Sequence, residues 1–209
     1  MKKILILGLM LLLLVSFASA ATEVTECMLI DASGDYTLMN DISGSYDGLR
    51  CIEITADNVV LDGSGYSIID DSDASTGIRV SGDNVEINNI QLESWTTGAL
   101  ESLGDSCGIY DSMFVSNRYS IYSSGENLEL SGNTFNGSTN AAIVLTPTSL
   151  NSLIYDNLFY ETSYLVFSDG ATYSLSETPY IDVNIIGGSY IGGNYWSNPS
   201  GDGFSEICD

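Results

Sequence analysis

Apolar residues alternate with polar ones in short stretches of this chain, with the period of a β-strand rather than that of a helix. Ile52 and Ile54 share one face of such a stretch, and Val59 and Leu61 share another. Gly, Asn, Asp and Ser separate the stretches, which are rich in Val, Ile, Tyr and Thr. Beyond residue 20, no segment keeps a convincing period of 3.6 over ten residues. The pattern predicts an all-β fold of short strands.

One short phrase recurs along the chain. Its copies are separated by steps of 26, 22, 21, 24 and 31 residues, and a period in this range is typical of solenoids. Large apolar residues lie eight positions after each start, and aliphatic residues lie six positions before the first four starts and eight before the fifth. The starts are Asn58, Asn84, Ser106, Asn127, Asn151 and a looser Asp182; the first column is Tyr66, Leu92, Phe114, Phe135, Phe159 and Tyr190, and the second is Ile52, Ile78, Leu100, Ile121 and Ile143.

A repeat of about 22 residues, built from short strands and polar corners, closes into one coil of a parallel β-helix. Stacked coils lie about 4.8 Å apart, so residues at equal offsets form columns. The apolar columns are expected to fill the bore. The Asn column that begins at Asn58 is expected at a corner, where its amides would hydrogen-bond to the coils above and below.

Two segments resemble a known family. The phrases Cys51-Ile-Glu-Ile-Thr-Ala-Asp-Asn-Val-Val-Leu-Asp-Gly-Ser-Gly-Tyr and Ile186-Gly-Gly-Ser-Tyr-Ile-Gly-Gly-Asn-Tyr-Trp-Ser-Asn-Pro-Ser-Gly are similar to the right-handed parallel β-helix surface proteins of methanogenic archaea. Those proteins are often grouped with NosD-like or carbohydrate-binding β-helix domains. The resemblance implies a single-domain, right-handed parallel β-helix of about six coils with N- and C-terminal caps. It says little about function, because this fold hosts lyases, hydrolases, adhesins and scaffolds.

Residues 1–20 have the pattern of a signal peptide. Lys2-Lys3 precedes an apolar run from Ile4 to Val15, and Ala18-Ser19-Ala20 fits a cleavage site. The run is shorter than the roughly 20 residues of a membrane span. An uncleaved anchor is the alternative. We expect a secreted or cell-surface protein without a transmembrane helix in the mature chain.

The remaining chain is expected to divide into an N-terminal cap (21–50), the β-helix (51–191) and a C-terminal cap or tail (192–209). Open solenoid ends need covering. The turn at Ser33-Gly34-Asp35 and the apolar Tyr36 suit the first cap. The aromatic tail suits the second, with a sugar-stacking platform as the alternative for Tyr195, Trp196 and Phe204.

Charge excludes several partners. Without residues 1–20 the chain keeps 28 acidic groups against Arg50, Arg79 and Arg118, and it has no histidine. Such a surface repels nucleic acid, anionic lipid and polyanionic glycans. A copper role is not indicated either, because only Met28, Met39 and Met113 remain as soft ligands.

Four cysteines follow the predicted signal peptide. Cys51 precedes an inward Ile52, so we expect it to point outward beside Cys27, with which it would form a disulfide. Cys107 shares the column of Val59 and should be a buried thiol. Cys208 is then left over. It would bond to a neighbouring molecule, giving self-assembly, or fold back to reach Cys107.

We predict no catalytic site, since histidine, the commonest acid–base residue, is missing. Asp70, Asp71 and Asp73 form the densest acidic cluster and are the candidates for glycan hydrolysis or lysis. They lie between turn signals, which favours a solvated loop. Asn136-Gly137-Ser138 is a glycosylation sequon.

An acidic residue precedes four successive corners. A column of carboxylates suits hard cations such as calcium, while the alternative is that these side chains only shape the corner. Calcium is the one cofactor that the sequence suggests. The column comprises Asp57, Asp83, Asp105 and Glu126.

A second outward column, Glu53, Arg79 and Glu101, alternates in sign and is expected to be a ladder of ion pairs. We interpret the chain as a non-enzymatic structural or adhesive β-helix, with envelope proteins or neutral glycans as partners. The alternative is a carbohydrate-binding or carbohydrate-active protein, hydrolase-like or lyase-like. It would use three exposed tyrosines, Tyr110, Tyr122 and Tyr155.

Overall fold

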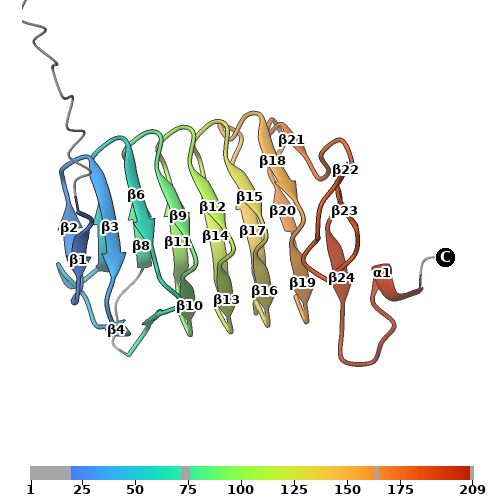
Figure 1. The fold of residues 1–209 in the computed structure, drawn as a ribbon, viewed down its shortest axis with the longest axis horizontal. Coiled ribbons are helices and arrows are strands. Elements are labelled where there is room, and N and C mark those ends of the chain that lie inside the picture. The colour runs from blue at the N-terminus through green and yellow to red at the C-terminus, as the bar shows by residue number, and fades with distance from the viewer. Residues whose placement is uncertain (1–19, 72–75, 163–164, 208–209) are drawn as a thin grey trace, which may run out of the picture.

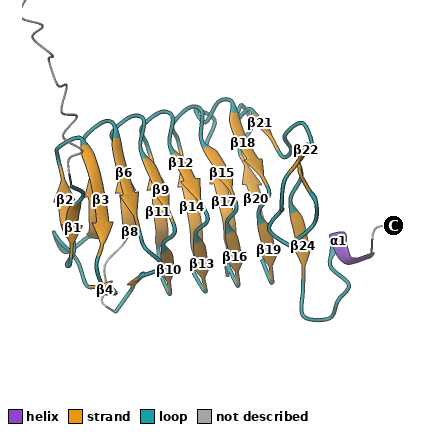
Figure 2. Cartoon of the chain, in the orientation of Figure 1, coloured by secondary structure: helices purple, strands orange, loops and turns teal. Residues whose placement is uncertain are grey.

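The computed structural model describes residues 20–71, 76–162 and 165–207, and it is almost entirely strand and turn (Figure 2). The chain winds into a β-solenoid of about six turns whose strands form three parallel sheets (Figure 1), which confirms the predicted all-β solenoid. The predicted signal peptide lies outside the described residues except for Ala20. Within the described ranges, no helix is long and apolar enough to cross a membrane.

Sheet A contains one strand from each coil. In spatial order it consists of β1 (Thr22–Val24), β3 (Gly34–Leu38), β6 (Val59–Asp62), β9 (Glu86–Asn88), β12 (Gly108–Tyr110), β15 (Glu129–Ser131), β18 (Ser152–Tyr155) and β21 (Tyr173–Ser174).

Sheets B and C complete each coil. Sheet B consists of β2 (Met28–Ile30), β5 (Arg50–Ile54), β8 (Thr76–Val80), β11 (Gly98–Ser102), β14 (Tyr119–Ser123), β17 (Ala141–Leu145) and β20 (Leu165–Phe167). Sheet C consists of β4 (Ile42–Ser43), β7 (Ser67–Ile69), β10 (Gln91–Glu93), β13 (Met113–Val115), β16 (Thr134–Asn136), β19 (Leu158–Tyr160) and β24 (Tyr195–Ser197). An antiparallel pair, β22 (Tyr180–Ile181) and β23 (Tyr190–Ile191), and the short helix α1 (Phe204–Ile207) follow the last complete coil.

The aliphatic column of sheet B has the predicted register. Ile52 pairs with Ile78, and the column continues coil by coil to Ile143. These side chains are fully buried. Residues 21–50 are part of the solenoid, because β2, β3 and β4 supply a strand to each of the three sheets.

The aromatic column of sheet C differs from the prediction at both ends. Ile68, not Tyr66, faces Leu92, because Gly63 to Gly65 form a turn that adds two residues to this coil. At the other end Trp196 takes the place predicted for Tyr190, which is exposed. Between them the rings of Phe114, Phe135, Phe159 and Trp196 stack with centroid separations of 5.0, 4.9 and 4.2 Å.

The sixth copy of the phrase is not a coil. Asp182 directly follows β22, which runs antiparallel to β23, and Val183 is exposed. The strand that continues sheet A is β21 instead, where Tyr173 pairs with Ser152.

A ladder of buried asparagines runs beside the aromatic stack, at the corner between sheets A and C. Asn133 is fully buried; its Oδ1 accepts the Ser112 amide at 3.0 Å, and its Nδ2 donates to Ile109 O at 2.8 Å. Asn157 repeats the arrangement, and the half-buried Asn194 continues it in the following coil. This ladder satisfies buried backbone groups at a corner where no strand pairing can do so.

The predicted asparagine column has a different role. Asn58, Asn84, Asn127 and Asn151 are exposed and adopt left-handed backbone conformations with φ of 55–56°. One amide contact within the column, from Asn151 Nδ2 to Asn127 Oδ1, measures 3.5 Å. Asparagine is favoured here because it tolerates positive φ, which the corner requires.

Candidate functional site

The acidic column lies at the corner between sheets B and A, as a continuous stack. Oδ1 of Asp57 accepts the backbone amide of Asp83 at 2.8 Å, and Asp83 does the same for Asp105 at 2.9 Å. Asp105 then accepts the amide of Glu126 at 2.8 Å. Each of these aspartates therefore fixes the corner of the next coil, which gives the acidic side chains a structural function. A calcium role for the column remains a prediction.

Glycines next to the column bring the coils into close contact. A Cβ on Gly104 would lie 2.0 Å from Gly82 O, and one on Gly125 would lie 1.9 Å from Gly104 O. Any side chain there would force the coils apart. The corner is therefore a rigid unit made of a small residue, an acidic residue and a residue with positive φ.

The predicted catalytic cluster is only partly described. Asp70 Oδ2 accepts from the amide and the hydroxyl of Thr96 at 3.4 and 3.5 Å, which ties two successive coils together. Asp71 is exposed, and Asp73 lies outside the described residues. The structure thus gives Asp70 a contact that positions the next coil.

The three tyrosines do not form one platform. Tyr110 and Tyr155 lie on the outer face of sheet A, where Tyr155 Oη donates to Glu129 Oε1 at 3.1 Å. Tyr122 projects from sheet B. Burial raises the pKa of both Tyr110 and Tyr155, and the Glu129 carboxylate raises them further. The hydroxyls of Tyr110 and Tyr155 therefore both lie beside the Glu129 carboxylate.

The predicted disulfide between Cys27 and Cys51 is confirmed. Cys51 is fully buried, however, where an outward position was expected. The equivalent position on the following coils carries Gly77, Ala99, Ser120 and Ala142, all buried. This column of small residues lies where the chain turns from sheet C into sheet B, so simple alternation fails there.

Cys107 is free and buried, as predicted. Burial raises the pKa of its thiol to about 11. Cys208, the cysteine considered for self-assembly, lies outside the described residues.

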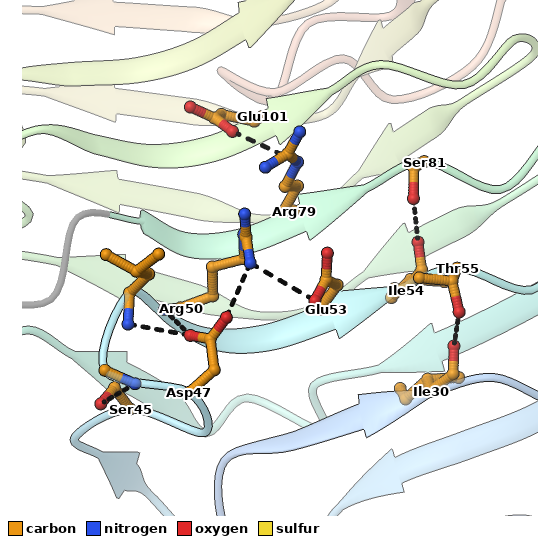
Figure 3. Close-up of polar contacts among 12 residues, drawn as sticks. Ile30, Ser45, Asp47, Arg50, Glu53, Ile54, Thr55, Arg79, Ser81 and Glu101 are labelled. Atoms are coloured by element: carbon orange, nitrogen blue, oxygen red, sulfur yellow. Dashed lines mark hydrogen bonds and ion pairs between the residues drawn. The ribbon is translucent and has the colours of Figure 1, made fainter.

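The expected ion-pair ladder on sheet B is built differently (Figure 3). Arg79 Nε lies 3.7 Å from Glu101, but Glu53 contacts Arg50 at 3.4 Å. Arg50 also pairs with Asp47 at 2.7 Å. Two of the three arginines are thus neutralised by neighbouring carboxylates.

The third arginine lines a cavity of about 480 Å³ on the outside of the corner between sheets C and B. Its walls come from three successive coils and carry hydroxyl, amide and guanidinium groups. Sequence reasoning missed this site, although a signal exists in the hydroxyl residues that flank Trp95 and Arg118. The lining residues are Ser94, Trp95, Thr96, Ser116, Arg118, Thr139 and Asn140.

Nine exposed apolar residues belong to the described part of the chain that follows β20, whose elements β22, β23 and α1 lie at one end of the rod (Figure 1). Ile181 is 81% exposed, Val183 71% and Phe204 70%, values that are unusual for residues of this type. The set comprises Tyr173, Leu175, Tyr180, Ile181, Val183, Ile186, Tyr190, Phe204 and Ile207, and we call it the C-terminal apolar end.

The sequon asparagine, Asn136, is half-buried at the end of β16. Ser138, the sequon hydroxyl, is buried and bonded to Ser120 Oγ at 2.7 Å. Glycosylation of Asn136 remains a prediction.

Comparison with known protein families identifies the family of this chain. A family model described as "Periplasmic copper-binding protein (NosD)" matches residues 16–201, which is most of the chain. No curated protein and no solved structure matches.

The described residues do not fit copper. The chain has no histidine, Cys27 and Cys51 are joined, and Cys107 is a buried thiol inside the bore. Met28 lies on sheet B, Met39 directly follows β3 of sheet A, and Met113 lies on sheet C, so the soft ligands are dispersed. Across the described ranges, no group of three or more His, Cys, Asp or Glu residues is arranged to hold a metal ion.

Proposed function

The chain belongs to the NosD family, and from that premise we propose that it is an exported, non-enzymatic β-solenoid that serves as a structural element of the cell envelope. The description of the family as periplasmic agrees with export and with the signal-peptide pattern of residues 1–20. In this proposal, copies of the chain join through the C-terminal apolar end. That end is the single observation that carries the proposal.

Two properties of the C-terminal apolar end support association. A concentration of exposed apolar side chains marks an interaction surface, because burying it removes unfavourable contact with water. Of the last strands of the three sheets, β21 and β20 are also sheet edges, and an edge offers unpaired backbone groups to an incoming strand. The edge of β24 is covered by α1, where Ser205 Oγ accepts the Trp196 amide at 2.9 Å.

A second copy of the chain is the partner whose cross-section fits this end. The opposite end of the rod also presents one edge from each sheet, in β1, β2 and β4. Stacking the C-terminal apolar end of one copy on the first coil of the next would continue sheets A and B, with α1 packed between the copies over sheet C. Such a head-to-tail contact repeats without closing and produces a filament or layer.

Sedimentation velocity over a range of concentrations tests the proposal, without reductant so that the Cys27–Cys51 disulfide stays intact and with Cys208→Ser to prevent cross-linking. Residues 21–209 should form oligomers as concentration rises. Ile181→Asp combined with Val183→Asp should keep the protein monomeric. Met113→Asp, which changes an exposed apolar residue on the flank of the rod, is the control and should assemble normally. A wild-type chain that stays monomeric throughout would overturn the proposal.

Carbohydrate binding is the second candidate. The corner cavity favours it, because its hydroxyl and amide lining suits a polyol. The dispersed tyrosines Tyr110, Tyr122 and Tyr155 do not supply a joint surface.

A further inference from the structure

The corner cavity is built from stacked turns that hold its walls in place. The amide of Ser94 donates to Val115 O at 3.0 Å, and that of Arg118 donates to Trp95 O at 2.8 Å. The amide of Asn140 donates in turn to Arg118 O at 3.0 Å. Backbone bonds between successive coils therefore fix the spacing of the side chains that line the cavity, so that a ligand would meet a preformed site.

Arg118 is the cation of this cavity. Arg50 and Arg79 have carboxylate partners, but among the described residues no carboxylate lies within ion-pair distance of Arg118. Its side chain is exposed. In a chain with 28 acidic groups, an arginine without an acidic partner retains a positive charge that a ligand can neutralise.

The guanidinium group is positioned by an aromatic ring. Its Cζ lies 5.3 Å from the centroid of the Tyr119 ring, within the range of a cation–π contact. The Tyr119 hydroxyl accepts a hydrogen bond from the Asn140 amide, which belongs to the next coil. Groups from two coils thus hold Arg118 beside the cavity. Because the side chain is already ordered, binding of a ligand costs less conformational entropy.

The chemistry of the lining defines the ligand. A guanidinium group recognises a carboxylate through two parallel hydrogen bonds. Around it, Ser94, Ser116 and Thr139 offer hydroxyls that both donate and accept, which matches the hydroxyl groups of a sugar ring, while the Thr96 hydroxyl donates to Asp70. Trp95 is fully buried, so little apolar surface is presented. From this combination we propose that the corner cavity binds a sugar acid, a saccharide that carries a single carboxylate.

Charge and size narrow the ligand further. A volume of about 480 Å³ is in the range of small-molecule sites and accommodates a mono- or disaccharide. The many acidic groups of the protein repel a polyanion, but at physiological salt their field is screened beyond about 8 Å. A single carboxylate in contact with Arg118 is therefore bound, while a polyuronate with many charges is disfavoured. This site is separate from the C-terminal apolar end and does not depend on assembly.

The test is a titration of residues 21–209 with four small molecules at matched ionic strength, in which ligand-observed NMR measures binding. Glucuronate and galacturonate carry both a ring and a carboxylate, glucose lacks the carboxylate, and acetate lacks the ring. At least one of the two sugar acids should bind more tightly than glucose and acetate. Binding of neither sugar acid would overturn the proposal. Equal binding of glucose would remove the carboxylate from it, and equal binding of acetate would remove the sugar.

Two variants locate the site. Arg118→Gln should weaken sugar-acid binding by about tenfold or more, since it removes a charge-assisted pair. Arg50→Gln lowers the net charge equally at a distant position and is the matched control, with circular dichroism to confirm that both variants fold. Unchanged binding in Arg118→Gln, or an equal loss in Arg50→Gln, would overturn the assignment.

Discussion

Replacing Asn133 by alanine tests the buried asparagine ladder, which was not predicted from the sequence. The Asn133 side chain makes three hydrogen bonds: it accepts from Ser112 N, and it donates to Ile109 O and to Asn157 Oδ1. Its relative exposure is 0%, so water cannot replace these bonds in the folded protein. Alanine would leave the Ser112 amide buried without its acceptor.

The expected loss follows from these contacts. An unsatisfied buried donor costs about 1–3 kcal/mol, and each of the other two lost hydrogen bonds about 1 kcal/mol. The variant should therefore lose about 3–5 kcal/mol of unfolding free energy. That is a large part of the roughly 5–15 kcal/mol that stabilises a typical domain.

Equilibrium unfolding in urea, followed by circular dichroism, measures the effect. Asn88→Ala is the matched control: Asn88 lies on the outer face of sheet A, where its Nδ2 donates to Glu86 at 3.1 Å. Its loss should change the stability by less than about 0.5 kcal/mol. Equal midpoints for the two variants would refute the interpretation of Asn133 as a structural ladder residue.

Three further predictions concern other parts of the chain. Because burial raises the pKa of Cys107, the contribution of this thiol to the free energy of unfolding should be full below the ordinary thiol pKa and should be lost as pH rises toward about 11. Cys107→Val should flatten this part of a pH–stability curve. In the wild-type protein, Cys107 should resist alkylation until the chain unfolds. Asp83→Ala should cost about 1–2 kcal/mol by thermal unfolding and Asp83→Asn much less, since asparagine keeps the acceptor for the next coil; equal melting curves in calcium and in ionic-strength-matched sodium would leave the acidic column without a cation. Reducing the Cys27–Cys51 bond, which closes a separation of 24 residues, should lower the unfolding free energy by about 3 kcal/mol, and an unchanged urea midpoint would contradict this.

Much of the fold follows from residues that recur at fixed offsets. The column from Ile52 to Ile143 could be predicted because each coil places an aliphatic residue at the same strand position. Prediction failed where the coil length changed. The extra turn before Ile68 shifted the aromatic column by two positions, and the β22–β23 pair separated Trp196 from the repeat.

Side-chain roles were harder to predict than positions. Alternation placed Cys51 outside, but a corner adjoins that end of the strand and buries it. An asparagine ladder was expected at Asn58, where asparagine is instead required for its positive φ. The true ladder at Asn133 was overlooked, although the phrase Asn133-Thr-Phe recurs in the next coil as Asn157-Leu-Phe. The corner cavity depends on three turns from successive coils, and its hydroxyl residues become one site only when the coils stack.

Hydrogen exchange measured at several protein concentrations tests most directly whether copies of this chain join through the C-terminal apolar end. Assembly would bury exposed backbone groups there, so peptides from residues 165–207 should become more protected as concentration rises. Peptides from the middle coils, residues 84–136, should exchange at a constant rate. Protection that does not depend on concentration, or that increases only in the middle coils, would contradict the proposed assembly.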